Sequence, residues 1–184
     1  MTVLAGISAC GSSTADETPK EPAPASDASE SPTRPAKGPL YTVMTEKADE
    51  GMGFSLRDAT SLNRYVSPAH AKKFKLCFEK EKPNLKAVIL YAVRNSETCP
   101  HKVGTEGKAE GTPDVVGTRL RKAIDRLVLT GYQPKHIHVD VNGKAVSEER
   151  SWSYEVCKQS PPPGTPFTAD LEPRLVISAS CLED

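Results

Sequence analysis

Five cysteines are the residues of this 184-residue chain with the clearest chemical potential. Cys10 stands alone near the N-terminus, and the other four form two similarly spaced pairs, Cys77 with Cys99 and Cys157 with Cys181. Four cysteines allow three connectivities, and the similar spacing favours one disulfide within each half of the chain. The C-x₂-C spacing typical of a zinc site is missing from the sequence, so we predict disulfides rather than a metal centre.

Three polar residues alternate with apolar ones near the middle of the second half, namely His136, His138 and Asp140. On one face of a strand, imidazole and carboxylate groups at this spacing can bind a metal ion. The apolar residues between them favour a simpler interpretation, in which the apolar face is buried and the polar face meets water. We therefore predict neither a metal nor a cofactor.

An aromatic pair, Trp152 and Tyr154, occupies one face of another predicted strand. An exposed pair of this kind can stack on a sugar or a peptide, whereas a buried pair closes a small core, and both interpretations stay open. The sequence contains no glycine-rich phosphate loop, no G-x-S-x-G and no H-E-x-x-H. Cysteines held in disulfides cannot supply a thiolate nucleophile, so we predict that the protein is not an enzyme.

The charge balance excludes one large class of partners. The chain has 24 Lys plus Arg against 24 Asp plus Glu, which gives a formal net charge of zero. Nucleic-acid binding needs a basic excess that displaces counterions from phosphates, so we predict no nucleic-acid partner. No apolar run in the sequence reaches the ~18 residues that a membrane-spanning helix requires.

The N-terminus predicts how the chain reaches a membrane. Residues 1–10 end in Ile7-Ser8-Ala9-Cys10, which resembles the bacterial lipobox after a signal peptide. The resemblance implies a lipid on Cys10, a lipid anchor in the cell membrane and an extracytoplasmic location, which permits disulfides. A basic leader is missing before the apolar residues, so we expect the true start codon to lie upstream.

Residues 11–39 predict a disordered tether between this anchor and the folded part. They contain no Val, Ile, Leu, Phe, Tyr or Trp and are rich in Pro, Ser and Ala. Such a segment cannot bury enough apolar surface to offset the entropy of ordering its backbone. Proline keeps it extended, so it can span roughly 90 Å at about 3.1 Å per residue.

The remaining residues contain signs of an internal duplication. The motif G-x-x-L-R-x-A occurs at residues 53–59 and 117–123, which lie 64 positions apart, whereas Cys77 and Cys157 lie 80 apart. We interpret the difference as about 16 extra residues in the second copy. The predicted boundaries are 40–99 for the first module, 100–111 for a glycine-containing loose linker and 112–184 for the second module.

Each copy is expected to contain one helix on a small antiparallel sheet. In the second copy the apolar residues recur at helical spacing, after a capping Thr118 and before a stop at Gly131. They are Leu120, Ala123, Ile124, Leu127 and Val128. In the first copy the predicted helix follows Ser55 and buries Leu56, Ala59 and Leu62. Strands are predicted at 87–93, 136–141, 151–156 and 174–181, with a hairpin at Asn142-Gly143.

The second copy resembles the PASTA module, which occurs outside the membrane on bacterial penicillin-binding proteins and serine/threonine kinases. The matching residues are Pro-Asp-Val-Val-Gly at 113–117, Leu120, Ala123-Ile124, Leu127, Gly131-Tyr132, Ser-Pro-Pro-Pro-Gly-Thr at 160–165 and Leu-Val-Ile-Ser at 175–178. The first copy is divergent and lacks the Pro-Asp-Val-Val run. The resemblance implies an α+β fold of two modules, each with one helix packed on a three-stranded antiparallel sheet.

The same resemblance implies a binding protein whose partner is cell-wall peptidoglycan, a muropeptide or a beta-lactam-like mimic of it. Trp152 and Tyr154 are the ligand contacts that this expectation favours. The alternative is a structural spacer, or an envelope lipoprotein that docks another envelope protein and takes no small ligand.

Overall fold

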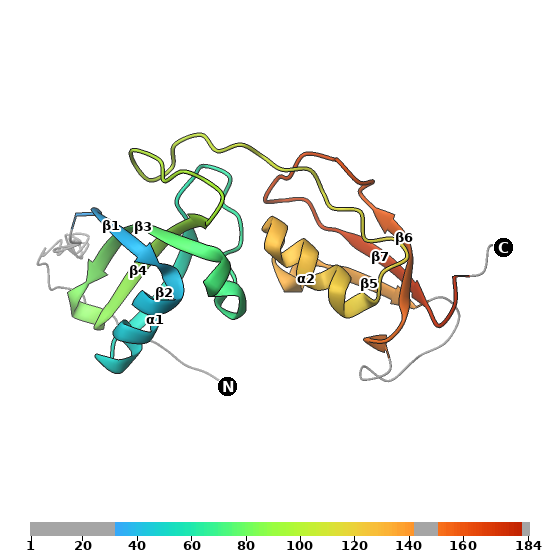
Figure 1. Cartoon of the computed structure of the whole chain (residues 1–184), viewed down its shortest axis with the longest axis horizontal. Helices are drawn as coiled ribbons and strands as arrows, with labels where there is room; N and C mark the ends of the chain where they lie inside the picture. The colour runs from blue at the N-terminus through green and yellow to red at the C-terminus, as the bar shows by residue number, and fades with distance from the viewer. Residues whose placement is uncertain (1–31, 142–150, 182–184) are drawn as a thin grey trace, which may run out of the picture.

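The computed structural model describes residues 32–141 and 151–181, which form two α+β modules joined by a long connection (Figure 1). Each module has its own sheet, of four strands in the first and three in the second. The lipobox with Cys10 and the predicted Asn142-Gly143 hairpin lie outside the described residues.

The first module contains one α-helix and a mixed sheet. Its strand order is β1-β3-β4-β2, in which β2 is parallel to β4 and the other pairs are antiparallel. Two short 3₁₀ turns, η1 and η2, flank β3. The elements are β1 (Arg34–Pro39), α1 (Leu40–Asp49), β2 (Gly53–Asp58), η1 (Pro68–Lys73), β3 (Phe74–Lys82), η2 (Pro83–Leu85) and β4 (Ala87–Arg94).

The second module contains a helix followed by three strands. Its strand order is β5-β7-β6, in which β5 is parallel to β7 and β6 is antiparallel to β7. The elements are α2 (Leu120–Thr130), the 3₁₀ turn η3 (Pro134–His136), β5 (His138–Val141), β6 (Glu155–Ser160) and β7 (Arg174–Ser178).

The two modules share one topology. In each, a helix precedes three strands, and the last strand lies between the other two, parallel to the first and antiparallel to the second. Leu40 and Leu120 begin the two helices and lie 80 positions apart. The glycines that follow the helices, Gly51 and Gly131, also lie 80 apart, and both have a positive φ that disfavours other residues.

This offset corrects the predicted alignment of the copies. Residues 53–58 form strand β2, so the helix predicted from Leu56, Ala59 and Leu62 is wrong, as is its cap at Ser55. The helix of the first module lies earlier, at Leu40–Asp49. Because helix starts and first cysteines are both 80 apart, the second copy has no 16-residue insertion before Cys157. The motif G-x-x-L-R-x-A has only four fixed positions, and it lies on strand β2 in the first copy but at the start of helix α2 in the second.

The predicted antiparallel sheets are also corrected. Both sheets are mixed, because β2 is parallel to β4 and β5 is parallel to β7, which lies between β5 and β6. The first module gains a fourth strand because residues 34–39, assigned to the tether, form β1 and pair with β3. Strand β6 begins at Glu155. The segment around Trp152, which the sequence predicts as part of this strand, forms a turn before it.

The predicted apolar face of α2 is confirmed. Leu120, Ala123, Leu127 and Val128 are buried, and the half-buried Ile124 packs against the same core. The predicted cap is wrong, because the helix begins after Arg119 and no side chain caps it. The hydroxyl of Thr118 donates instead to the carbonyl oxygen of Val115 at 2.7 Å, which stabilises the turn before the helix.

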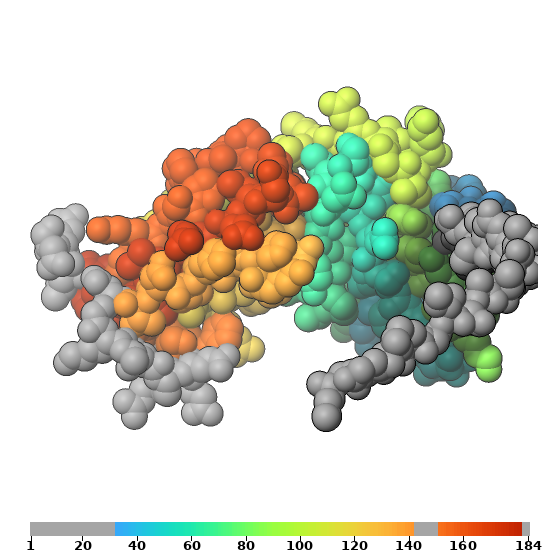
Figure 2. Space-filling view, turned by 180° about the vertical axis from the view of Figure 1, so that it is seen from behind, coloured from blue at the N-terminus to red at the C-terminus, as the bar shows by residue number. Residues whose placement is uncertain are grey.

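The modules pack directly against each other. Leu62 and Tyr65 of the first module pack on the core of the second, and Leu129 of α2 packs on the core of the first. Figure 2 shows α2, in orange, meeting the cyan-green residues that follow β2. His70 and Asp125 also approach each other across this boundary, with 3.7 Å between the imidazole Nε2 and a carboxylate oxygen. The helix of one module is therefore partly covered by a loop of the other.

The linker, expected to be a loose joint, is tied to the first module. The amide of Gly104 donates to the carbonyl of Ala59, and the amide of Ser61 donates to the carbonyl of Thr105, both at 2.9 Å. A Cβ on Gly107 would lie 2.8 Å from the hydroxyl oxygen of Thr60, so the linker needs a glycine to approach this closely.

Candidate functional site

The four module cysteines form two disulfides, each within one module. Cys77 bonds Cys99 and Cys157 bonds Cys181, with Cα atoms 5.4 and 5.2 Å apart, which is the pairing that the sequence spacing favours. Each first cysteine lies where the strand register shifts, in β3 and in β6 respectively. Each disulfide therefore links an irregular position within one strand to the segment that follows the last strand of the same module.

The three polar residues considered as metal ligands do not form a cluster. His136 lies in η3, outside the strand that holds His138 and Asp140. The Nε2 atom of His138 lies 2.8 Å from a carboxylate oxygen of Glu172, and this hydrogen bond lowers the pKa of Glu172. Among the described residues, no three His, Cys, Asp or Glu side chains gather closely enough to hold a metal ion. None of the helices in this part of the chain is long and apolar enough to span a membrane.

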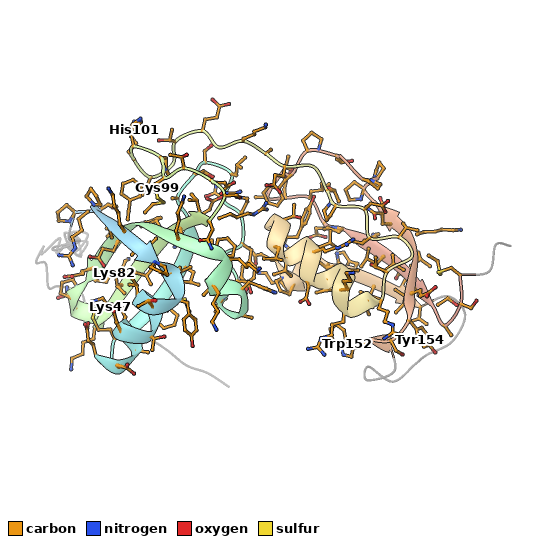
Figure 3. All side chains as sticks on the ribbon, in the orientation of Figure 1. Lys47, Lys82, Cys99, His101, Trp152 and Tyr154 are labelled. Carbon is orange, nitrogen blue, oxygen red and sulfur yellow. A yellow bond between two sulfur atoms is a disulfide. The ribbon has the colours of Figure 1, made fainter. Side chains whose placement is uncertain are left out.

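Trp152 lies beside α2 at the entrance to strand β6, as Figure 3 shows. Its side chain lines a hollow of about 570 Å³, and the residue is 39% exposed, which leaves part of the indole open to a ligand. A second hollow of about 410 Å³ shares three residues with the first. We call the two together the Trp152 hollow, lined by Arg119, Arg121, Lys122, Ile124, Asp125, Trp152 and Ser153.

Backbone hydrogen bonds fix the turn that carries Trp152 against the start of α2. The amide of Leu120 donates to the carbonyl of Tyr154 at 2.8 Å, and the amide of Tyr154 donates to the carbonyl of Ser151 at 3.0 Å. Tyr154 is half-buried and packs against the core of the second module. The predicted aromatic pair is thus divided, because Trp152 lines the hollow and Tyr154 contributes to packing.

The charges of the Trp152 hollow favour an anion. Among the described residues that line it, Arg119, Arg121 and Lys122 supply three positive charges, against one carboxylate from Asp125. An indole next to guanidinium groups suits a ligand with an apolar or sugar face and a nearby carboxylate. Nothing in the sequence singles out these basic residues, because their spacing on the helix is that of an ordinary solvent-facing surface.

A buried ionic network, also missed from the sequence, lies at the boundary between the modules. The side chains of Asp58 and Arg64 are 1% and 6% exposed, and the guanidinium Nε donates to the carboxylate at 2.7 Å. The same carboxylate accepts the amides of Thr60 and Arg64, at 3.0 and 3.1 Å. Glu97 binds the far side of the guanidinium, with 2.9 Å between its carboxylate oxygen and Nη2.

The network shifts the pKa values of Arg64 and Glu97 in the directions expected for a satisfied ion pair. Burial lowers the pKa of Arg64, but hydrogen bonds to Asp58 and Glu97 outweigh burial and raise it overall. Burial raises the pKa of Glu97, and the bonds from Arg64 and from the Arg94 amide outweigh it and lower the pKa. Arg64 and Glu97 are therefore charged at neutral pH, and the network holds the loop after β2 in place.

Comparison of the chain with known protein families, with curated proteins and with solved structures gave no match.

Proposed function

We propose that this protein is an extracytoplasmic, membrane-anchored lipoprotein that binds cell-wall peptidoglycan or its fragments in the Trp152 hollow. The observation that carries the proposal is a partly exposed indole that shares a hollow with three basic side chains and one acidic one from the part of the chain that the structure describes. Peptidoglycan offers the matching groups, since its sugars have apolar faces and its lactyl and peptide portions carry carboxylates.

The size and composition of the hollow suit such a fragment. Its larger part, of about 570 Å³, lies in the range of small-molecule sites. Trp152 and Ile124 supply apolar surface for the face of a sugar ring, and Arg121 can bind a carboxylate with two parallel hydrogen bonds. An oligosaccharide without carboxylates is expected to use only the first of these contacts.

The sequence supports the same proposal in two ways. The resemblance of the second module to PASTA modules implies contact with peptidoglycan, and the lipobox-like residues before Cys10 imply a lipid anchor outside the cytoplasm. Replacing Cys10 by Ser is expected to release the protein from membranes, as measured by fractionation. A protein that stays with the membrane after this replacement would contradict the proposed anchor.

The test is the retention of the full chain on purified peptidoglycan sacculi. Trp152→Ala should reduce retention by about tenfold, the loss expected for one stacked aromatic contact. Tyr41→Ala, which removes an exposed aromatic side chain of the first module, serves as the matched control and should bind as the unaltered protein does. Added soluble muropeptide should release the bound protein.

The alternative role is that of a spacer or protein-docking lipoprotein. The direct packing of the two modules favours it, because a packed pair forms a firm extension at the end of a tether. Failure of the unaltered protein to bind sacculi would contradict the peptidoglycan proposal and leave this alternative. Equal retention of the Trp152→Ala and unaltered proteins would contradict the assignment to the hollow.

A further inference from the structure

A second concavity lies between the two modules and shares no residue with the Trp152 hollow. It has a volume of about 740 Å³, and its walls come from η1, the end of β4, the connection between the modules and the last turns of α2. We call it the intermodule cavity, lined by Lys73, Arg94, Asn95, Ser96, Glu110, Pro113, Asp114, Arg126, Leu129 and Thr130.

Charged side chains of both signs line this cavity, with a small positive excess. Lys73, Arg94 and Arg126 are basic, whereas Glu110 and Asp114 are acidic. Arg94 forms an ion pair with Glu110 through Nη1, so these two charges balance. The remaining groups carry one net positive charge, which suits a ligand with a single negative charge rather than a phosphate dianion.

The guanidinium of Arg94 has an unused donor beside this cavity. Its Nη2 atom is buried and has no hydrogen-bond partner among the described residues. A buried donor without an acceptor costs free energy, and the guanidinium fork is shaped to bind a carboxylate. A carboxylate bound in the cavity would satisfy this donor once the Arg94 side chain turns it toward the cavity.

Two further contacts shape the cavity around this group. The Nη1 atom of Arg126 donates to the backbone carbonyl of Asp114 at 3.0 Å, which joins the connection to α2. One carboxylate oxygen of Asp114 accepts the amide of Val116 at 3.1 Å, and this exposed residue lines the cavity, where its carboxylate can accept a ligand N–H. Leu129 and Pro113 add apolar wall between the charged groups.

We propose that the intermodule cavity binds a short peptide through its free C-terminal carboxylate. The carboxylate would meet Lys73, Arg94 and Arg126, the side chains of the peptide would lie on Leu129 and Pro113, and its N–H groups would face Asp114. The volume suits a ligand of a few residues. Because the two sites share no residue, this proposal is independent of the function proposed for the Trp152 hollow.

The test is titration of the full chain with trialanine and with its C-terminal amide, followed calorimetrically. Trialanine should bind, and the amide should bind at least about tenfold more weakly because it lacks the charged acceptor. Arg126→Gln and Lys73→Gln should each weaken trialanine binding by a similar factor. Arg174→Gln is the matched control, since it removes an exposed guanidinium of β7 that lines neither concavity and should leave trialanine binding unchanged.

Several outcomes would overturn the proposal. They are no binding of trialanine at up to about 10 mM, equal binding of the amide, and equal losses in Arg174→Gln and in the two cavity variants. If Arg126→Gln loosens the connection that it holds, Lys73→Gln decides, because Lys73 is exposed and its replacement spares the Arg126–Asp114 contact. Trp152→Ala should keep full trialanine binding, so the two proposals fail separately.

Discussion

Arg64 of the first module packs directly on Gly131, the residue that ends α2 in the second. A Cβ atom built on Gly131 would lie 2.6 Å from the Cβ of Arg64, closer than side-chain atoms approach in folded proteins. Beside it, the amide of Tyr65 donates to the carbonyl of Gly131 at 2.7 Å. The end of a helix in one module is thus the docking point for a loop of the other.

Replacing Gly131 by Ala tests this contact. The φ of 120° at Gly131 disfavours an alanine, and the new methyl group would collide with Arg64. We expect the free energy of unfolding to fall by about 2 to 4 kcal/mol, measured by denaturant titration. Gly117→Ala is the control, because Gly117 also has a positive φ but no atom near its Cβ position, so about 1 kcal/mol is expected. Equal losses in the two variants would show that the modules do not meet at Gly131.

Asp58→Asn tests the buried ionic network. The replacement keeps the size of the side chain and removes the charge that compensates the buried guanidinium of Arg64. We expect a loss of about 3 to 5 kcal/mol in the free energy of unfolding. Glu81→Gln, which removes one partner of the exposed Arg34, should cost less than about 1 kcal/mol. A small effect of Asp58→Asn would mean that water reaches the network.

The pKa of Glu97 predicts how stability changes in acid. Folding lowers this pKa below the ordinary value of 4.5, so the charged carboxylate stabilises the folded state above that pH. As the pH falls below about 4.5, the unfolded chain takes up the proton first, and this contribution is lost until the folded pKa is passed. Denaturant titrations from pH 7 to pH 2.5 should show a shallower acid loss in Glu97→Gln than in the unaltered protein. Parallel curves for the two proteins would contradict the lowered pKa.

Removal of the second disulfide should destabilise its module. The bond between Cys157 and Cys181 closes a loop of 24 residues, which contributes roughly 3 kcal/mol in the chain-entropy model. The double variant with serine at both positions is expected to unfold at lower denaturant, as reported by the fluorescence of Trp152 in the same module. Unchanged unfolding after complete chemical reduction of the unaltered protein would contradict this expectation.

Local chemistry predicted the second module better than the first. Five apolar residues at helical spacing and the stop at Gly131 located α2, because a pattern this regular places all five residues on one face only if the segment is a helix. The helix α1 has only two buried residues, Leu40 and Met44, so its periodicity is weak. The parallel pairing of β2 with β4 depends on contacts distant in sequence, which no local rule specifies.

Of the residues that line the Trp152 hollow, only Trp152 itself was predicted from the sequence, because its residue type alone marks it as a possible ligand contact. Trp152 is the chain's only tryptophan and stands out from type alone, but the basic residues beside it become neighbours only when the turn before β6 docks on α2. The network of Asp58, Arg64 and Glu97 joins groups that are 33 positions apart at its widest bond. In the sequence each of them is an ordinary surface charge.

The helix α2 presents residues to two different concavities. Arg121, Ile124 and Asp125 line one, whereas Arg126, Leu129 and Thr130 line the other. The helix α2 therefore sets the distance between the two concavities, and the Arg64–Gly131 contact preserves that distance. A branched ligand could bind both concavities at once. After its first group binds, the second group would be held at a high effective concentration near its own site, and the length of α2 would set the spacing that such a ligand needs.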